Sequence, residues 1–185
     1  MRGLVLGFAA LGLAACDSGN VPSPTERMNE QGSGGPSISL DGVELRGGGL
    51  AAGSEAFYFS AGQNEVIGAL AGVLGEAGET VSNDECGAGP MQFASFPGGL
   101  TVNFQEGGLV GWNIGLSDEP VANRIDVVGD VQIGTGREEV QAADGFKPFE
   151  DSTLGEEFSL GPNIGGFIEE GSVAMMYAGT QCFFR

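Results

Sequence analysis

The chain has 185 residues, with 25 Asp and Glu against 7 Lys and Arg, which gives a formal net charge of −18 at pH 7. Such a charge repels phosphate backbones and anionic headgroups, so we expect neither nucleic-acid binding nor electrostatic docking on a membrane surface. The chain also lacks histidine, the commonest general base and transition-metal ligand, and we predict no catalytic, cofactor-binding or metal-binding residues.

Residues 1–15 have the layout of a bacterial lipoprotein signal peptide. Arg2 precedes an apolar run from Leu4 to Leu13, and Cys16 follows two alanines. The run of about ten residues is too short to cross a hydrocarbon core of ~30 Å. We therefore expect removal of residues 1–15 and lipidation of Cys16, with acyl chains holding the protein on a membrane. An ordinary secretory signal cut at the same place is the alternative.

Residues 16–37 are rich in Ser, Pro, Gly and Asn and poor in large apolar side chains. This composition predicts a flexible tether with a root-mean-square reach of roughly 25 Å. The predicted location is the cell envelope, with the body facing the periplasm or the exterior. The sequence leaves open which membrane carries the anchor.

The remaining chain contains a Gly-x-x-Glu-Val segment twice, at 62–66 and 136–140, which indicates an internal repeat. Each segment follows a short apolar run and is predicted to begin a helix. The first helix would present one apolar face and the second would end near Ala143. Ser60 with Gln63, and Thr135 with Glu138, have the spacing of capping boxes. The apolar face of the first helix is formed by Val66, Leu70, Val73, Leu74 and Ala77.

Strand-like runs separated by Gly-rich turns follow each predicted helix. In the first copy they cover about 91–96, 100–104 and 109–112, and in the second copy about 158–160, 165–168 and 173–177. The order of a helix followed by an antiparallel meander predicts an α+β fold of two tandem helix-plus-antiparallel-sheet units, at 38–118 and 119–185.

Three cysteines occur in the chain. With Cys16 assigned to lipid, Cys86 and Cys182 remain as a pair in an oxidising compartment, and a disulfide is the expected state. Because one cysteine precedes the first predicted meander and the other follows the second, the bridge would join the two copies. Two buried free thiols are the alternative.

The two helix-plus-sheet units with their Gly-x-x-Glu-Val helix starts resemble the beta-lactamase inhibitor protein and the small outer-membrane assembly lipoproteins of the SmpA/OmlA type. The whole body is also similar to uncharacterised lipoproteins of alphaproteobacteria, most specifically around Cys86-Gly87-Ala88-Gly89 and 178–182. The resemblance implies a protein-binding role in envelope assembly or enzyme inhibition. It carries over no individual binding residue.

An enzyme is the rival interpretation. Proteins similar to this one are sometimes labelled aspartate-semialdehyde dehydrogenase, and Ser60-Ala61-Gly62-Gln63 faintly resembles a loop of that family. Gly47, Gly49 and Ala52 fit a dinucleotide-binding pattern, but no strand–helix–strand unit follows them. A calcium site near Asp126 and Asp130, or at 83–85, lacks EF-hand spacing.

Adjacent acidic pairs are expected to lie on solvated strand edges, because neighbouring strand residues point to opposite faces. These pairs are Asp84-Glu85, Asp118-Glu119, Glu138-Glu139, Glu156-Glu157 and Glu169-Glu170. Phe93, Phe104 and Trp112 are expected in the core. The aromatics that could instead form an exposed binding patch are Phe57, Tyr58, Tyr177, Phe183 and Phe184. The preferred hypothesis is a lipid-anchored, non-catalytic module that binds an envelope protein.

Overall fold

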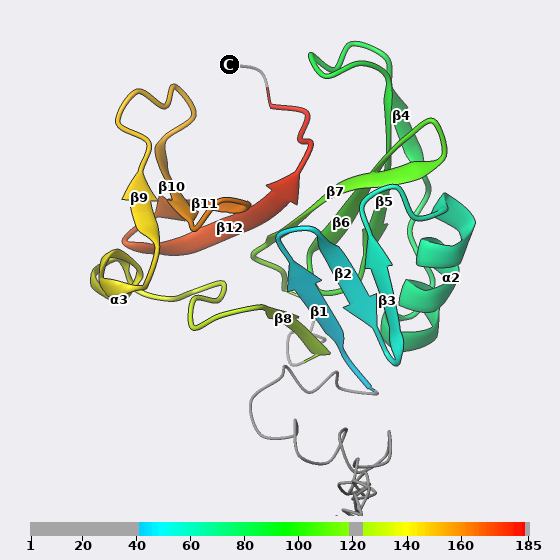
Figure 1. Cartoon of the computed structure of the whole chain (residues 1–185), viewed down its shortest axis with the longest axis horizontal. Helices are drawn as coiled ribbons and strands as arrows, with labels where there is room; N and C mark the ends of the chain where they lie inside the picture. Colours follow the sequence, from blue (N-terminus) through cyan, green and yellow to red (C-terminus); the bar gives the residue numbers. More distant parts are fainter. Residues whose placement is uncertain (1–40, 119–123, 184–185) are drawn as a thin grey trace, which may run out of the picture. The chain divides into compact units, whose positions relative to one another are not determined.

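The computed structural model describes residues 41–118 and 124–183, which belong to one compact unit. Within the described ranges the chain forms two sheets and two helices, and most of its regular structure is β (Figure 1). None of the helices described is long and apolar enough to span a bilayer.

The smaller sheet has four strands in the order β3-β2-β1-β8. Its first three strands form an antiparallel meander, whereas β8 joins β1 in parallel. Leu45 pairs with Leu50 on one side and with Val127 on the other, which places three buried aliphatic side chains in one row. The strands are β1 (Val43–Arg46), β2 (Gly49–Ala52), β3 (Glu55–Tyr58) and β8 (Ile125–Val127).

The larger sheet has eight antiparallel strands in the order β4-β5-β6-β7-β12-β11-β10-β9. It consists of two four-stranded meanders that meet where β7 pairs with β12, with Trp112 opposite Ala178 and Asn113 opposite Tyr177. The first meander contains β4 (Val81–Asn83), β5 (Met91–Phe96), β6 (Leu100–Gln105) and β7 (Gly108–Gly115). The second contains β9 (Phe146–Pro148), β10 (Glu156–Leu160), β11 (Ile164–Glu169) and β12 (Ser172–Gly179).

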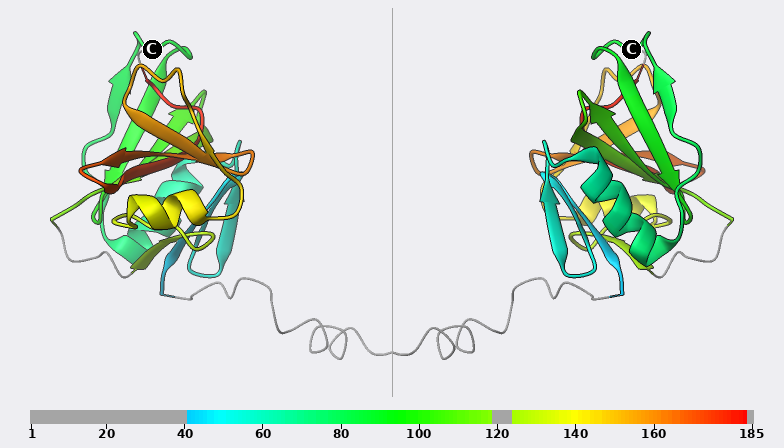
Figure 2. Two further views of the ribbon diagram at one scale, coloured as in Figure 1. Left: turned by 90° about the vertical axis from the view of Figure 1, so that its left-hand side faces the viewer. Right: turned by 90° about the vertical axis from the view of Figure 1, so that its right-hand side faces the viewer.

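Both Gly-x-x-Glu-Val segments begin a helix: α2 spans Gln63–Leu74 and α3 spans Arg137–Ala142. Figure 1 shows α3 and α2 on opposite sides of the unit, and each view of Figure 2 has one of them in front and the other behind. Val66 in α2 and Val140 in α3 are both completely buried.

The predicted capping boxes are wrong, because neither glycine N-cap is accompanied by a side-chain hydrogen bond. Thr135 Oγ1 instead accepts a hydrogen bond from the Gln132 amide at 2.9 Å.

The two helix starts are tied to the large sheet by matching backbone hydrogen bonds. The Gln63 amide donates to the Gly107 carbonyl, and the Arg137 amide donates to the Gly171 carbonyl, each at 2.9 Å. In both places the acceptor is the glycine of a Glu-Gly turn whose two residues have positive φ. Positive φ at both positions is the geometry of the tightest hairpins. These turns therefore bring each meander back to the start of its helix.

The predicted fold class is nevertheless wrong. The chain is mostly β, with a four-stranded and an eight-stranded sheet and two short helices among the described residues, and it does not form two tandem α+β units. The reason lies at β7 and β12. Each would be an unpaired edge strand in a separate unit, and such edges are exposed to unwanted pairing, whereas their mutual pairing makes one continuous sheet.

The core lies between one face of the large sheet and the layer formed by the small sheet and the two helices, both of which contribute buried side chains to it. The expected core residues Phe104 and Trp112 are fully buried, whereas Phe93 is only partly buried. Trp112 Nε1 donates to the carbonyl oxygens of Arg46 at 2.8 Å and Gly49 at 3.0 Å. A buried indole N–H commonly needs an acceptor, and the backbone carbonyls on either side of the β1–β2 turn supply it here.

Candidate functional site

The C-terminal segment crosses the second face of the large sheet, the face away from α2. Gln181 Nε2 donates to the carbonyl oxygens of Trp112 at 3.0 Å and Ala178 at 2.8 Å. Asn103 Nδ2, fully buried on β6, donates to the Thr180 carbonyl oxygen at 2.9 Å and to Gln181 Oε1 at 3.0 Å. These hydrogen bonds hold the C-terminal segment along β7, next to the second meander.

The predicted disulfide between Cys86 and Cys182 is confirmed, with their Cα atoms 5.2 Å apart. The bridge links the loop before β5 to the segment after β12, and so fastens the end of the described chain to the first meander. Cys16, the predicted lipidation residue, lies outside the described residues, as do the predicted signal peptide and tether.

The five aromatics expected to form an exposed patch do not gather in one place. Tyr177 and Phe183 pack edge to face, with ring centroids 5.1 Å apart. Phe57 packs against the core, Tyr58 stands 74% exposed on β3, and Phe184 lies outside the described residues. Tyr177 and Tyr58 therefore do not share a patch, and the ring of Tyr177 packs with that of Phe183 instead.

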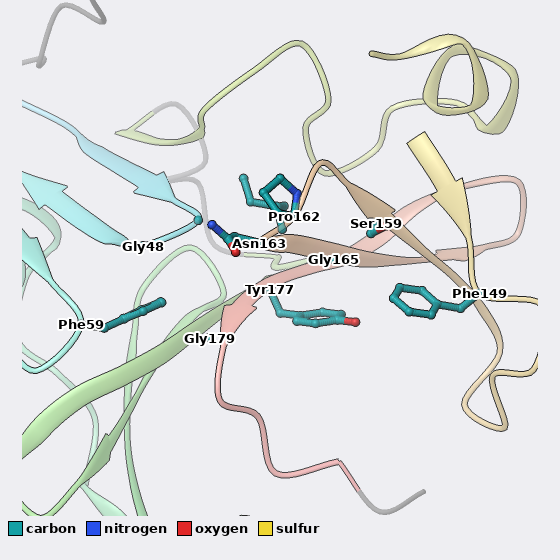
Figure 3. A pocket seen from close by; sticks show the side chains of 11 residues that line it. Gly48, Phe59, Phe149, Ser159, Pro162, Asn163, Gly165, Tyr177 and Gly179 are labelled. Carbon is teal, nitrogen blue, oxygen red and sulfur yellow. The ribbon is translucent and has the colours of Figure 1, made fainter. Parts of the chain in front are cut away.

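An open groove of about 490 Å³ lies along the second meander, beside Tyr177 (Figure 3). Figure 3 shows Tyr177 between Phe59, which follows β3, and Phe149, which follows β9, with the Tyr177 hydroxyl pointing toward Phe149. The volume of the groove is within the usual range for ligand sites, roughly 300–1,000 Å³. The lining residues are Gly47, Gly48, Phe59, Phe149, Ser159, Pro162, Asn163, Ile164, Gly165, Tyr177 and Gly179.

Glycines allow two of these rings to lie against the backbone. A Cβ atom at Gly165 would collide with the ring of Tyr177, and one at Gly179 would lie 2.2 Å from the Val110 carbonyl oxygen and 2.7 Å from Phe59 Cζ. Real Cβ atoms essentially never approach a neighbour so closely. The rings are therefore seated directly on the strands, and any larger residue beneath them would have to push them outward.

A buried carboxylate fixes the orientation of the Tyr177 ring. Glu157 is only 2% exposed, and its Oε1 accepts a hydrogen bond from the Tyr177 hydroxyl at 2.5 Å. The other oxygen, Oε2, accepts from Ser152 Oγ at 2.5 Å. Because a buried carboxylate is costly unless its oxygens are satisfied, Glu157 favours the ring position in which the hydroxyl reaches it.

The adjacent acidic pair Glu156-Glu157 therefore departs from the expected solvated edge. Glu156 faces solvent and makes two hydrogen bonds with the guanidinium of Arg137, at 2.8 and 2.6 Å. The hydrogen bond and the charge of Glu156 both raise the pKa of Arg137 above its ordinary value. The residue that matters for the groove is its neighbour Glu157, which the strand alternation turns to the opposite face.

The other acidic pairs of the described residues do not converge; Glu138 and Glu139 lie in the first turn of α3 and not on a strand edge, and Glu119 lies outside the described residues. Among residues 41–118 and 124–183, no group of three or more His, Cys, Asp or Glu is arranged to hold a metal ion. Gly47, Gly49 and Ala52, which matched a dinucleotide-binding pattern, belong to the antiparallel β1–β2 hairpin. That hairpin has neither the parallel strands nor the helix that position a pyrophosphate in such sites.

Of the three aromatic residues that line the groove, only Tyr177 is among the binding candidates that the sequence predicts, and Phe59 and Phe149 are not. Phe149, Pro162 and Asn163 lie in connections between strands, where periodicity gives no information. One usable signal was available: in the strand Glu156–Leu160, alternation places Glu157 and Ser159 on the same face. Comparisons with family models, with curated proteins and with solved structures found no match for this chain.

Proposed function

We propose that the chain is a lipid-anchored protein of the bacterial cell envelope whose folded body binds another envelope protein and catalyses no reaction. In this proposal residues 1–15 are removed, Cys16 carries the lipid, and residues 16–37 tether the body to the membrane. The support for the anchor is the order of a charged start, a short apolar run, two alanines and a cysteine.

The observation that carries the binding role is the groove beside Tyr177. Its aromatic rings are already held in position, two by contact with glycines and one also by the buried carboxylate of Glu157. Aromatic side chains provide much of the contact energy in protein interfaces, and fixed rings lose little conformational entropy when a partner binds. Phe149, at the rim, is 46% exposed and accessible to a partner.

The same site is poorly suited to acid–base chemistry. A catalytic carboxylate has to reach the reacting atoms, whereas Glu157 is 2% exposed and both of its oxygens accept hydrogen bonds from hydroxyl groups. This geometry suits a supporting role behind Tyr177, and it favours a binding module over an envelope enzyme that works with carboxylates.

Two measurements test the proposal. In membrane fractionation after a carbonate wash, the wild-type chain should remain with the membranes, whereas Cys16→Ser should appear in the soluble fraction. In crosslinked cells, purification of the wild-type chain should yield one envelope protein in near-stoichiometric amount. A Cys16→Ser protein that still sediments with membranes contradicts the anchor, and recovery of the chain without any crosslinked protein contradicts the binding role.

A further inference from the structure

We infer that the groove beside Tyr177 binds an extended, proline-containing segment of the partner that has Lys or Arg at its flank. This inference rests on the proposed protein-binding function and names the chemistry of the segment.

The rings are suited to a polyproline II segment. Phe59, Tyr177 and Phe149 come from three separate parts of the chain and lie one after another along the groove (Figure 3). Extended proline-containing segments dock in grooves of this kind, because their rings and Cβ atoms pack between aromatic side chains. Such segments are already extended before binding, so they lose little entropy on docking.

The polar groups of the lining suit the backbone of the same ligand. A polyproline II segment makes no hydrogen bonds within itself, so its carbonyl groups need partners when water is displaced. Ser159 Oγ and Asn163 Nδ2 can donate such bonds, and both residues line the groove. The lining contains no charged side chain, so the part of the ligand inside the groove should also be uncharged.

The charge at the rim of the groove determines which residues can flank the bound segment of the partner. The exposed acidic residues Glu150 and Asp151 directly follow Phe149, which lines both the groove and the neighbouring hollow formed by residues 148–152. Lys147 lies opposite the lining residue Ser159. Arg46, which precedes the lining residue Gly47, is already ion-paired with Glu44, so among the described residues beside the groove Lys147 is the one cation without such a pair. Two acids against one cation, on a chain of net charge −18, attract a basic flank and repel an acidic one.

Photocrosslinking in cells can separate this inference from the proposed function. A photoreactive phenylalanine analogue replaces Phe149, at the groove rim, or Tyr58, an exposed aromatic that does not line this groove. We expect an adduct from position 149 whose crosslinked peptide is proline-containing and carries Lys or Arg, and at least about tenfold less from position 58. An envelope-protein adduct that maps to a helical or acidic segment, or that forms equally from both positions, overturns the inference and leaves the proposed function intact. The absence of any adduct overturns both.

Binding measurements on the purified full chain in detergent micelles provide the second test. The probes are a synthetic peptide with a Pro-Pro-Leu-Pro core and two flanking arginines, a version with alanine for proline, and a version with glutamate for arginine. We expect Phe149→Ala to weaken binding of the first peptide by about tenfold, and Tyr58→Ala to leave it unchanged. Both substitutions are at exposed positions, so both proteins should fold. Equal binding of the three peptides, or binding of the neutral sugar chitobiose in their place, overturns the inference.

Discussion

The hydrogen bond between Tyr177 and Glu157 predicts a measurable loss of stability when only the hydroxyl is removed. Tyr177→Phe keeps the ring and its packing but takes away the donor that lies 2.5 Å from Glu157 Oε1. A hydrogen bond to a charged group contributes about 1.5–3 kcal/mol, and a carboxylate that is 2% exposed cannot readily recover the lost bond from water. We therefore expect the free energy of unfolding to fall by about 2 kcal/mol.

Urea denaturation is a suitable assay, with Tyr58→Phe as the matched control. The control removes the same hydroxyl from a side chain that is 74% exposed and solvated in the folded and unfolded states alike, so the stability should change by less than about 0.5 kcal/mol. With a denaturant slope of about 2 kcal/mol per molar urea, the loss in Tyr177→Phe corresponds to a midpoint lowered by about 1 M.

A change in slope would make the comparison of midpoints uninformative, so the two slopes have to agree first. With equal slopes, a midpoint for Tyr177→Phe within about 0.2 M of the control would refute the argument. Glu157 would then be satisfied without the phenol, and the carboxylate could not be what holds the ring at the groove.

Three further outcomes are expected. Reducing the disulfide, which closes a loop with a sequence separation of 96, should cost about 4–5 kcal/mol in the chain-entropy model and lower the melting temperature by about 10 °C in calorimetry. Val66→Asp places an unpaired charge at a fully buried position and should leave little folded protein by circular dichroism, whereas Glu65→Gln, at an exposed position, should be nearly silent. Gly165→Ala should displace the Tyr177 ring, alter the near-ultraviolet circular dichroism of tyrosine and cost about 1–3 kcal/mol, whereas Gly68→Ala, an open helical position, should stabilise the chain by about 0.8–1 kcal/mol.

The parts of the fold that could be predicted from the sequence are governed by local patterns. The start of α2 follows from the spacing of Val66, Leu70 and Leu74, which are all buried. Three strands of each meander follow from alternating apolar residues between Gly-containing turns, whereas the three-residue edge strands β4 and β9 were not predicted. The disulfide follows from the expected oxidising compartment and from the number of cysteines left after Cys16 is set aside for the predicted lipid.

The arrangement of these elements could not be predicted in the same way. Nothing in the separate patterns of β7 and β12 shows that they pair with each other, because strand pairing over a long sequence separation depends on the whole core. The small sheet was also missed as a unit. All four residues of β2 (Gly49–Ala52) are buried, so the strand lacks the alternation by which a half-exposed strand is recognised.

Glu157 shows why the candidate site was harder to predict than the fold. An adjacent acidic pair is ordinarily solvated, and only alternation along β10 indicates that its two members face opposite ways. Burial of the second member depends on hydroxyl groups supplied by Ser152 and Tyr177, and the phenol belongs to β12, two strands away. A buried carboxylate becomes favourable only when all its partners are present, so no local pattern of residues can reveal it.

The chain contains 35 glycines, and two of them have a specific use at the groove. A ring that packs directly on a strand needs a residue without a Cβ atom beneath it, and Gly165 and Gly179 supply that space under Tyr177 and Phe59. The glycine lowers the local stability of the strand, while the aromatic ring that covers it restores apolar burial. Contact between the glycine and the ring that covers it also fixes the height of that ring above the sheet. Rings that are seated in this way lose little conformational entropy when a partner binds, and for this reason we infer a preformed, extended ligand for the groove.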